Sequence, residues 1–374
     1  MNEQEGENMS LKITWKQGPA YPALIKGPAA GIVDGRFLVA GGMSYPWREA
    51  EYGFWLGIDE EIEAIPSLVV PGEQIESPIG KWHPLPSLPI GPGWTSGAAV
   101  AGGLAVVGGR RRAVGMRATS DVWFLDVRGG KTTWERLADR PTPAMVATTF
   151  ADGDLLYTAF GTDWQPHEHA TEDSNIYRMD VSKRSGWEVV TQFPGKPRWF
   201  PGVTRCNGKL YVISGRDQPV GGVKDVQPYN AHKVDSDGTT VYVAFREVWE
   251  CDLETGEWQE LARPPRAFAC EAFTVADRWV VLTGGDSWVV YPQGVSVAIK
   301  SYEPKLDFFC YSHEAWAYDT HMGEWSALNP LPYGVCSHRV ATWGNRVFTI
   351  GNETLDKKRS NAYGTVFEGT IEIT

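Results

Sequence analysis

The feature that most constrains the fold is a repeat that recurs along the whole chain. Each copy has an apolar alternating strand, a tight turn, a second strand that ends in glycine, and a third strand followed by tryptophan. In the clearest copy, the apolar runs 98–101 and 104–107 flank Gly102-Gly103, which is a hairpin signal. The second strands end at Gly41-Gly42, Gly108-Gly109, Gly161, Gly215, Gly284-Gly285 and Gly351.

The spacing of the tryptophans identifies the kind of repeat. Trp15, Trp82, Trp134, Trp187, Trp258 and Trp325 are separated by 67, 52, 53, 71 and 67 residues. The shorter separations match the period of about 50 residues of kelch repeats, and the longer ones imply insertions near 43–60, 216–245 and 286–313. The chain therefore resembles the kelch family over residues 11–374. The resemblance implies an all-β fold, a six-bladed kelch-type β-propeller, in which the repeat Gly and Trp residues are structural.

The two ends of the chain are complementary. Trp15 has no double glycine before it, whereas Gly351 is followed by a third strand, 365–373, and by no Trp. We expect the N-terminal strand Leu11–Gly18 to close the last blade beside the C-terminal strands, which removes open sheet edges. Residues 11–374 are then one propeller domain, and residues 1–10, which are polar and acidic, form a flexible tip.

Composition excludes several classes of partner. Lys and Arg total 35 against 46 Asp and Glu, and a net charge of −11 opposes binding to a phosphate backbone, so we expect no nucleic acid. The five scattered cysteines lack CxxC spacing and indicate free thiols. No stretch approaches the roughly 18 apolar residues of a membrane span, and the N-terminus lacks an apolar h-region. We predict a cytoplasmic protein without a membrane partner.

Function must come from a site on the fold. In kelch propellers, the loops between second and third strands share one face with the loops that precede first strands, and the long insertions fall on that face here. Arginine binds carboxylates through two hydrogen bonds and flat rings stack on sugars, which favours an anionic saccharide. The candidate substrate-binding residues are Arg110, Arg198, Trp199, Arg216, Arg266, His167 and Tyr333.

Structural alternatives exist for several of these residues. Pro197-Arg198 and Pro265-Arg266 match a frequent kelch feature in which arginine bonds loop carbonyls, and Arg110 could belong to a solvated loop. In His167-Glu168-His169 the two imidazoles are two residues apart and could chelate a metal, contact substrate, or be solvated. We predict no metal and no cofactor.

One segment carries a more specific resemblance. Residues 350–361, Ile-Gly-Asn-Glu-Thr-Leu-Asp-Lys-Lys-Arg-Ser-Asn, resemble a loop of the bacterial sialic-acid mutarotases in which a glutamate is followed six residues later by an arginine. Glu353 and Arg359 occupy these places, and Pro332-Tyr333-Gly334-Val335 also resembles that family. The resemblance implies that Glu353 is an acid/base and Arg359 binds the substrate carboxylate. The alternative is a loop held by a salt bridge.

These observations favour a carbohydrate-active propeller that transfers protons, as a mutarotase or epimerase does, on an acidic sugar. The alternative is a non-catalytic kelch module that binds a sugar or a protein partner, so the sequence leaves enzymatic activity open. A copper radical oxidase would need a Tyr–Cys pair and two histidine ligands, and the seven histidines show no such motif.

Overall fold

The structure is a computed structural model that describes most of the repeat. It covers residues 9–18, 21–22, 25–43, 68–69, 82–90, 92–111, 117–163, 173–216, 220–221, 240–241, 245–290, 296–299, 301–303, 308–310, 312–356 and 359–374. Most of the predicted N-terminal tip lies outside these residues. Within them the regular structure is β, apart from one 3₁₀ turn, η4 (Arg128–Gly130).

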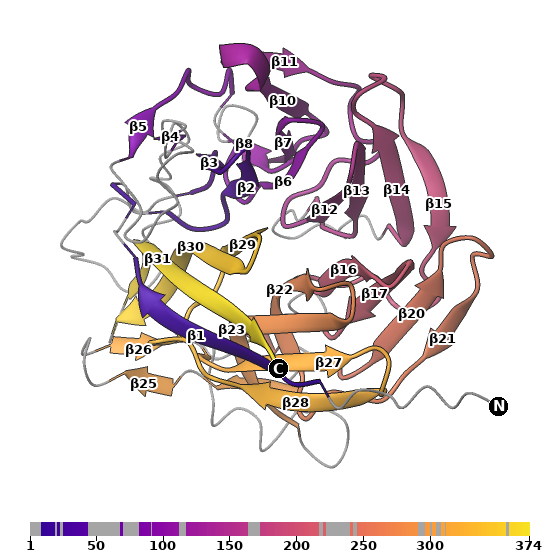
Figure 1. The fold of residues 1–374 in the computed structure, drawn as a ribbon, viewed down its shortest axis with the longest axis vertical. Coiled ribbons are helices and arrows are strands. Elements are labelled where there is room, and N and C mark those ends of the chain that lie inside the picture. Colours follow the sequence, from indigo (N-terminus) through magenta and orange to yellow (C-terminus); the bar gives the residue numbers. More distant parts are fainter. Residues whose placement is uncertain are drawn as a thin grey trace.

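The strands form antiparallel sheets that follow one another around a common centre (Figure 1). Four of these sheets contain β2 (Ala29–Val33), β3 (Arg36–Ala40), β4 (Leu68–Val69) and β5 (His83–Pro84); β6 (Ser96–Val100), β7 (Gly103–Val107), β10 (Val122–Asp126) and β11 (Thr133–Arg136); β12 (Thr148–Asp152), β13 (Leu155–Ala159), β14 (Asn175–Asp180) and β15 (Glu188–Gln192); and β16 (Gly202–Cys206), β17 (Lys209–Ile213), β20 (Val248–Asp252) and β21 (Trp258–Glu260).

The remaining large sheets come from the C-terminal part and the N-terminal strand. One contains β22 (Phe268–Val275), β23 (Trp279–Val290), β27 (Ala315–Asp319) and β28 (Glu324–Leu328), with β24 (Ser296–Ile299) paired to β23. The other contains β1 (Leu11–Gln17), β31 (Arg359–Ile373), β30 (Arg346–Asp356), β29 (Arg339–Trp343), β26 (Phe308–Cys310) and β25 (Ser301–Glu303). Two short pairs are β8 (Arg110–Arg111) with β9 (Arg117–Ala118), and β18 (Val220–Gly221) with β19 (Thr240–Val241).

The arrangement is an all-β propeller, as the sequence predicts. The innermost strand of each large sheet contacts that of the next sheet around the centre, in the order β2, β6, β12, β16, β22 and β29. β29 in turn contacts β2. In the β2–β5 sheet the outer strands β4 and β5 have two residues each, whereas every strand of the other large sheets in the described residues has at least three.

The two ends of the chain pair as expected. β1 runs antiparallel to β31, in register from Leu11 opposite Ile373 to Gln17 opposite Phe367 (Figure 1). The side chain of Ile13 is fully buried in a cluster that includes Val281 and Val347. The N-terminal strand therefore contributes to the core as well as to the sheet.

Two expectations about loops are wrong. The segment after Gly351 is not a loop: β30 continues to Asp356 and β31 begins at Arg359, so this part of the chain is a β-hairpin. The insertion expected at 286–313 also contains strands, because β23 extends to Val290 and pairs with β24. The β-branched residues Val289, Val290 and Val297 of these strands favour this pairing.

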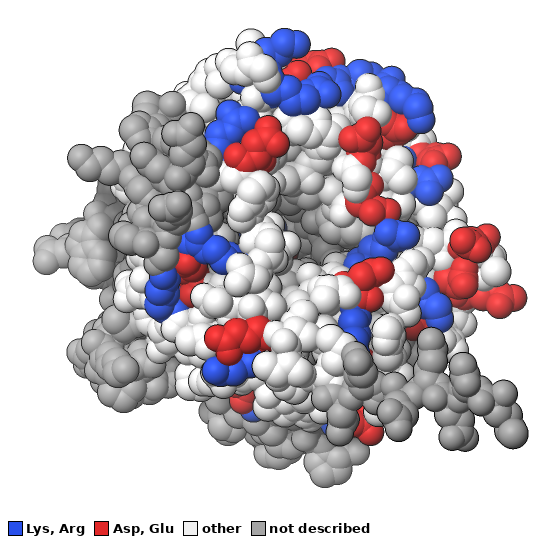
Figure 2. All heavy atoms as spheres, viewed as in Figure 1, with Lys and Arg blue, Asp and Glu red and all other residues white. Residues whose placement is uncertain are grey.

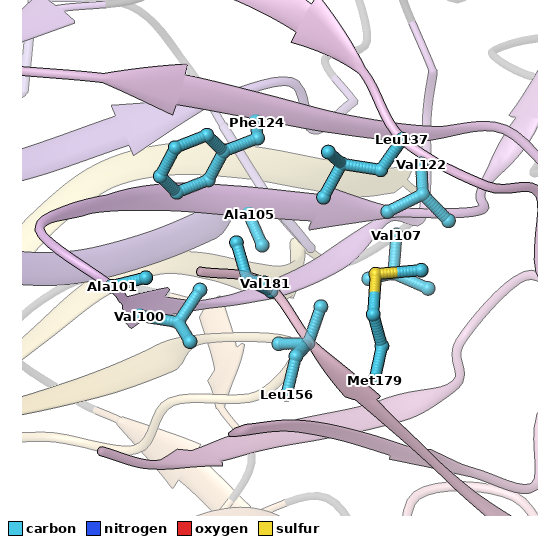
Figure 3. Close-up of a cluster of buried hydrophobic side chains, with 10 residues drawn as sticks. All are labelled: Val100, Ala101, Ala105, Val107, Val122, Phe124, Leu137, Leu156, Met179 and Val181. Atoms are coloured by element: carbon cyan, nitrogen blue, oxygen red, sulfur yellow. The ribbon is translucent and has the colours of Figure 1, made fainter. Parts of the chain in front are cut away.

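Neighbouring sheets pack through apolar side chains. Figure 3 shows one such cluster, in which Phe124 and Val107 of one sheet face Leu156 and Met179 of the next. The repeat tryptophans add hydrogen bonds between sheets: the indole Nε1 of Trp134 donates to the Pro86 carbonyl at 2.8 Å. The corresponding donors are Trp187 to Ala138 (3.0 Å), Trp258 to Thr191 (3.0 Å) and Trp325 to Ala262 (3.0 Å). The structural role predicted for these four tryptophans is confirmed.

The repeat glycines are needed where the chain leaves the second strand. Gly109 has φ +107°, and a Cβ there would lie 2.8 Å from the carbonyl oxygen of Gly93. Only glycine combines this left-handed backbone with such close approach. Cys206, Cys251, Cys270 and Cys336 are buried. In the described part of the chain, no helix is long and apolar enough to cross a membrane.

Candidate functional site

In several sheets, the segment before the first strand lies against the segment after the second strand of the same sheet. Isolated antiparallel bridges join them at the same place in four successive sheets. The bridged pairs are Lys26 with Met43, Gly93 with Arg110, Met145 with Thr162, and Trp199 with Arg216. In these sheets the two kinds of loop that were expected to share a face are therefore adjacent.

The residue after each bridge has an unusual backbone. Gly27, Trp94, Val146 and Phe200 have φ of +54°, +52°, +51° and +50°, and Ser337 of the last sheet has +55°. Non-glycine residues rarely adopt this conformation, and each one costs on the order of 1–3 kcal/mol. Such strain is retained where neighbouring contacts fix it, which is common at binding sites.

Hydrogen bonds connect these residues from sheet to sheet. The Gly27 N–H donates to the Ser337 carbonyl at 2.7 Å, and the Val146 N–H donates to the Trp94 carbonyl at 3.0 Å. The Cys270 N–H donates to the Phe200 carbonyl at 3.1 Å. The strained residues are thus held in place by bonds around the ends of the inner strands.

Four side chains meet at this position and are called the cation–aromatic cluster here: Lys26, Trp94, Phe200 and Arg216. The Lys26 Nζ lies 4.6 Å from the centroid of the Trp94 ring. The rings of Trp94 and Phe200 meet edge to face at 5.8 Å, and the Arg216 guanidinium lies 5.0 Å from the Phe200 ring. Two cations therefore flank two aromatic rings that come from separate sheets.

The surroundings of the cluster are apolar. Met145, Val146 and Trp199 are buried, and Trp94 and Phe200 pack against them while staying half-buried. Lys26 is buried with 1% of its surface exposed. Figure 2 shows one face of the molecule, with side chains of both charges around a central hollow. Positive charge beside partly exposed rings suits a ligand with a carboxylate and an apolar face.

Arg110 lies next to the cluster and is not part of a solvated loop. Its side chain is buried, one of its terminal nitrogens is 3.8 Å from the Met43 sulfur, and its backbone begins β8. The Met43 backbone is in turn bonded to Lys26. The Trp199 ring, another candidate, lies 6.0 Å from the Arg216 guanidinium.

Arg198 has the geometry of a structural residue. Its guanidinium is buried and donates to the carbonyls of Lys196 and Ser214 at 3.1 and 3.0 Å. It also donates to the Glu247 carboxylate at 2.9 Å. The same carboxylate accepts a hydrogen bond from the indole N–H of Trp249. Burial alone would raise the pKa of Glu247, but these hydrogen bonds outweigh it and lower that pKa.

Arg266 repeats the arrangement one sheet later. It pairs with Glu314, and the Trp316 indole donates to the same carboxylate at 3.1 Å. The matching geometry favours the structural alternative that the sequence left open for both Pro-Arg pairs. Tyr333 also bonds within the fold: its hydroxyl is 3.0 Å from that of Thr365, and its ring packs edge to face on Phe367.

The remaining predicted residues are only partly covered. Glu353 lies in β30 opposite Ala362, and Arg359 lies in β31 opposite Asp356, but their side chains are outside what the structure describes. His167 lies in a segment outside the described residues. Within the described residues, no group of three or more His, Cys, Asp or Glu side chains could hold a metal ion.

A second polar group lies on the inner strands β22 and β29. Arg339 is buried and pairs with Glu271; it also donates to the carbonyls of Pro28 at 2.9 Å and Thr95 at 2.7 Å. Burial raises the pKa of Glu271, and the charge and hydrogen bond of Arg339 offset only part of this effect. Burial also lowers the pKa of His338 to about 3, with a further contribution from Arg339.

Sequence reasoning missed Lys26, Phe200, Glu271 and Arg339. A signal was present, because Lys26 and Phe200 both lie in the short segment that precedes the inner strand of their repeat, as Trp94 does. Aligning the repeats would have placed Phe200 at the position of Trp94 and Lys26 one residue before it, but would not have shown that their side chains meet.

The comparisons with known proteins agree with the fold. No protein-family model matches the chain. It is 27% identical over 257 residues, 64% of its length, to N-acetylneuraminate epimerase of Yersinia pestis, and spans 58% of that relative. It is 25% identical over 217 residues to the enzyme of that name from Yersinia enterocolitica, covering 53% of the chain and 49% of the relative. N-acetylneuraminate epimerase 1 of Escherichia coli is 22% identical over 205 residues, with 50% of each protein covered.

A solved structure of the protein YjhT has the same fold. It superposes with a TM-score of 0.64 at 16% identity and covers 96% of this chain and 99% of YjhT. The resemblance to sialic-acid mutarotase/epimerase-like propellers that the sequence indicated is confirmed: the chain is similar to N-acetylneuraminate epimerases in sequence and to YjhT in fold.

Proposed function

We propose that the chain is a carbohydrate-active propeller that transfers protons, as a mutarotase or epimerase does, on an acidic sugar at the loop-rich face. The observation that carries the proposal is the cation–aromatic cluster. Arg216 is half-buried and is placed to attract a carboxylate, and the buried Lys26 adds positive charge beneath the rings, while Trp94 and Phe200 offer ring surfaces to the C–H face of a sugar. The names of the relatives support the same ligand class.

Ring opening and reclosure need two proton transfers. A base removes the proton from the anomeric hydroxyl while an acid protonates the ring oxygen, so that the bond between the anomeric carbon and the ring oxygen breaks. The open form closes on either face of the carbonyl and returns both protons. We assign the acid/base role to Glu353 and the carboxylate clamp to Arg359, with Arg110, Trp199 and His167 as further contacts.

We also propose that residues 11–374 form one ring of six kelch-type blades, closed by the N-terminal strand, in a cytoplasmic protein. The succession of contacts from β2 to β29 and back to β2 supports six blades. The pairing of β1 with β31 supports the closure. On this view the sheet of β2, β3, β4 and β5 is a blade with short outer strands.

The proposed function is tested by anomer-exchange NMR with N-acetylneuraminate, together with titration calorimetry. Glu353→Gln should abolish exchange and retain binding, because the amide keeps the shape and loses the base. Arg359→Ala should weaken binding of acidic sugars by about 2–4 kcal/mol and leave neutral sugars nearly unchanged.

Three outcomes would contradict the proposal in different ways. If the wild-type protein binds no acidic sugar and leaves the exchange rate at its uncatalysed value, the sugar function is wrong. Binding without faster exchange would instead favour the non-catalytic sugar-binding module. If both variants behave like the wild type, Glu353 and Arg359 are not the reacting pair.

A further inference from the structure

One side chain connects the inner strands of several sheets. Arg339 begins β29, yet its three donor groups reach three other sheets: Nε bonds the Pro28 carbonyl before β2, Nη2 bonds the Thr95 carbonyl before β6, and Nη1 pairs with Glu271 of β22. The Arg339 side chain is 7% exposed, so these are buried, charge-assisted hydrogen bonds.

Each group that Arg339 contacts is connected to a residue of the cation–aromatic cluster, either directly along the chain or through one backbone hydrogen bond. Pro28 is two residues after Lys26, and Thr95 directly follows Trp94. Glu271 directly follows Cys270, whose N–H donates to the Phe200 carbonyl at 3.1 Å. Arg339 is therefore linked through backbone to three of the four residues that form the cluster.

The backbone at these positions needs such support. Trp94 and Phe200 have positive φ, and a non-glycine residue in this conformation persists only where surrounding contacts hold it. The planar guanidinium can donate in three fixed directions at once, whereas the ammonium of a lysine is a compact charge without this geometry.

We propose that Arg339 is a positioning residue for the cation–aromatic cluster, and that Glu271 holds the guanidinium in place. Arg339 fixes the distance between Lys26 and Trp94 and the approach of Trp94 to Phe200, so that the ligand meets a preformed surface. The role in ligand binding rests on the proposed function. The role in placing Trp94 does not, because it concerns the unliganded protein.

The experiment compares Arg339→Lys with a matched control, Arg278→Lys. Arg278 is another largely buried arginine. It lies between β22 and β23, at the opposite end of β22 from Phe268, and donates to both carboxylate oxygens of Asp319. Protein labelled with 5-fluorotryptophan gives fluorine resonances from its 17 tryptophans, and Trp94→Phe identifies that of Trp94. Stability and affinity for N-acetylneuraminate are measured on the same samples.

We expect Arg339→Lys to shift or broaden the Trp94 resonance and to weaken the binding of N-acetylneuraminate by at least about tenfold, as misplacement of a binding group does. Arg278→Lys should lower stability and leave both unchanged. Glu271→Gln, which retains the two carbonyl bonds of Arg339, should give a smaller shift of the same resonance.

The proposal is overturned if Arg339→Lys lowers stability while the Trp94 resonance stays as in the wild type, because Arg339 is then a stabilising residue alone. If Arg339→Lys does not fold, Glu271→Gln decides, and an unchanged Trp94 resonance in that variant rejects the proposal. Wild-type protein that binds no acidic sugar would reject the proposed function but leave the fluorine test of positioning intact.

Discussion

His338 shows how a single buried side chain connects structure to pH. Its ring lies next to Thr283, with Nε2 3.2 Å from the Thr283 hydroxyl, and a Cβ on Gly284 would lie 3.1 Å from its Cε1. Burial, with the neighbouring charge of Arg339, lowers the pKa of His338 to about 3. The imidazole is therefore neutral in the folded protein, whereas in the unfolded chain it takes up a proton near pH 6.5.

This difference makes stability depend on pH. The folded pKa is below the unfolded value, so the contribution of His338 is fully present above pH 6.5 and is lost as the pH falls towards the folded value of about 3. Between pH 6 and 5 the free energy of unfolding should fall by close to 1.4 kcal/mol per pH unit from this residue. The same slope should be missing in His338→Gln, measured by urea unfolding. An equal slope in both proteins would contradict the assignment.

For individual residues, the sequence indicated which side chains lie near the site, but it did not distinguish those that could bind a ligand from those that hold the fold. The repeat position of Arg198 and Arg266 raised a structural alternative, which their contacts with Glu247 and Glu314 favour. The cluster could not be predicted as a unit, because Lys26 and Phe200 meet Trp94 only after the sheets close around the centre. A pattern within one repeat gives no information about which side chains from separate repeats will touch.

Among the strands, β1 makes the most distant connection along the chain. It pairs with β31 through seven residue pairs, and Ile13 fills a cluster shared with the sheet of β22 and β23. The complementary ends made this pairing predictable from the sequence. The extension of β30 and β31 into a hairpin was not, because Asn352, Glu353 and Asp356 are types that are poor strand formers.

Removing β1 should therefore be costly, whereas removing the residues before it should not. Deletion of residues 1–10 should lower the unfolding temperature only slightly, because it removes the backbone hydrogen bonds of Ser10 with Thr374 and leaves β1 in place. Deletion through Gly18 should abolish cooperative unfolding, because it exposes the edge of β31 and empties the position of Ile13. Differential scanning calorimetry measures both. Cooperative melting of the longer deletion at the wild-type temperature would show that β1 is not needed for the fold.

For the whole molecule, the meeting of the two ends predicts tolerance to a new chain order. The Ser10 N–H donates to the Thr374 carbonyl at 2.7 Å, and Thr374 donates back to Ser10 at 3.1 Å. Joining these residues through a short glycine-serine linker and opening the chain between Gly129 and Gly130 should give a cooperative, folded protein. A Cβ on either glycine would meet nothing within 4 Å, so no packing is lost there. A permuted chain that aggregates or melts without cooperativity would contradict the prediction that the fold tolerates the new chain order.

The pairing of β1 with β31 also sets the order of events during synthesis. The strand Leu11–Gln17 hydrogen-bonds to residues 367–373, which leave the ribosome only after the strands of all the other sheets. Throughout the intervening synthesis this strand has an unpaired edge and Ile13 has no core to enter. The edge of this strand must therefore stay protected from pairing with other chains until residues 367–373 emerge.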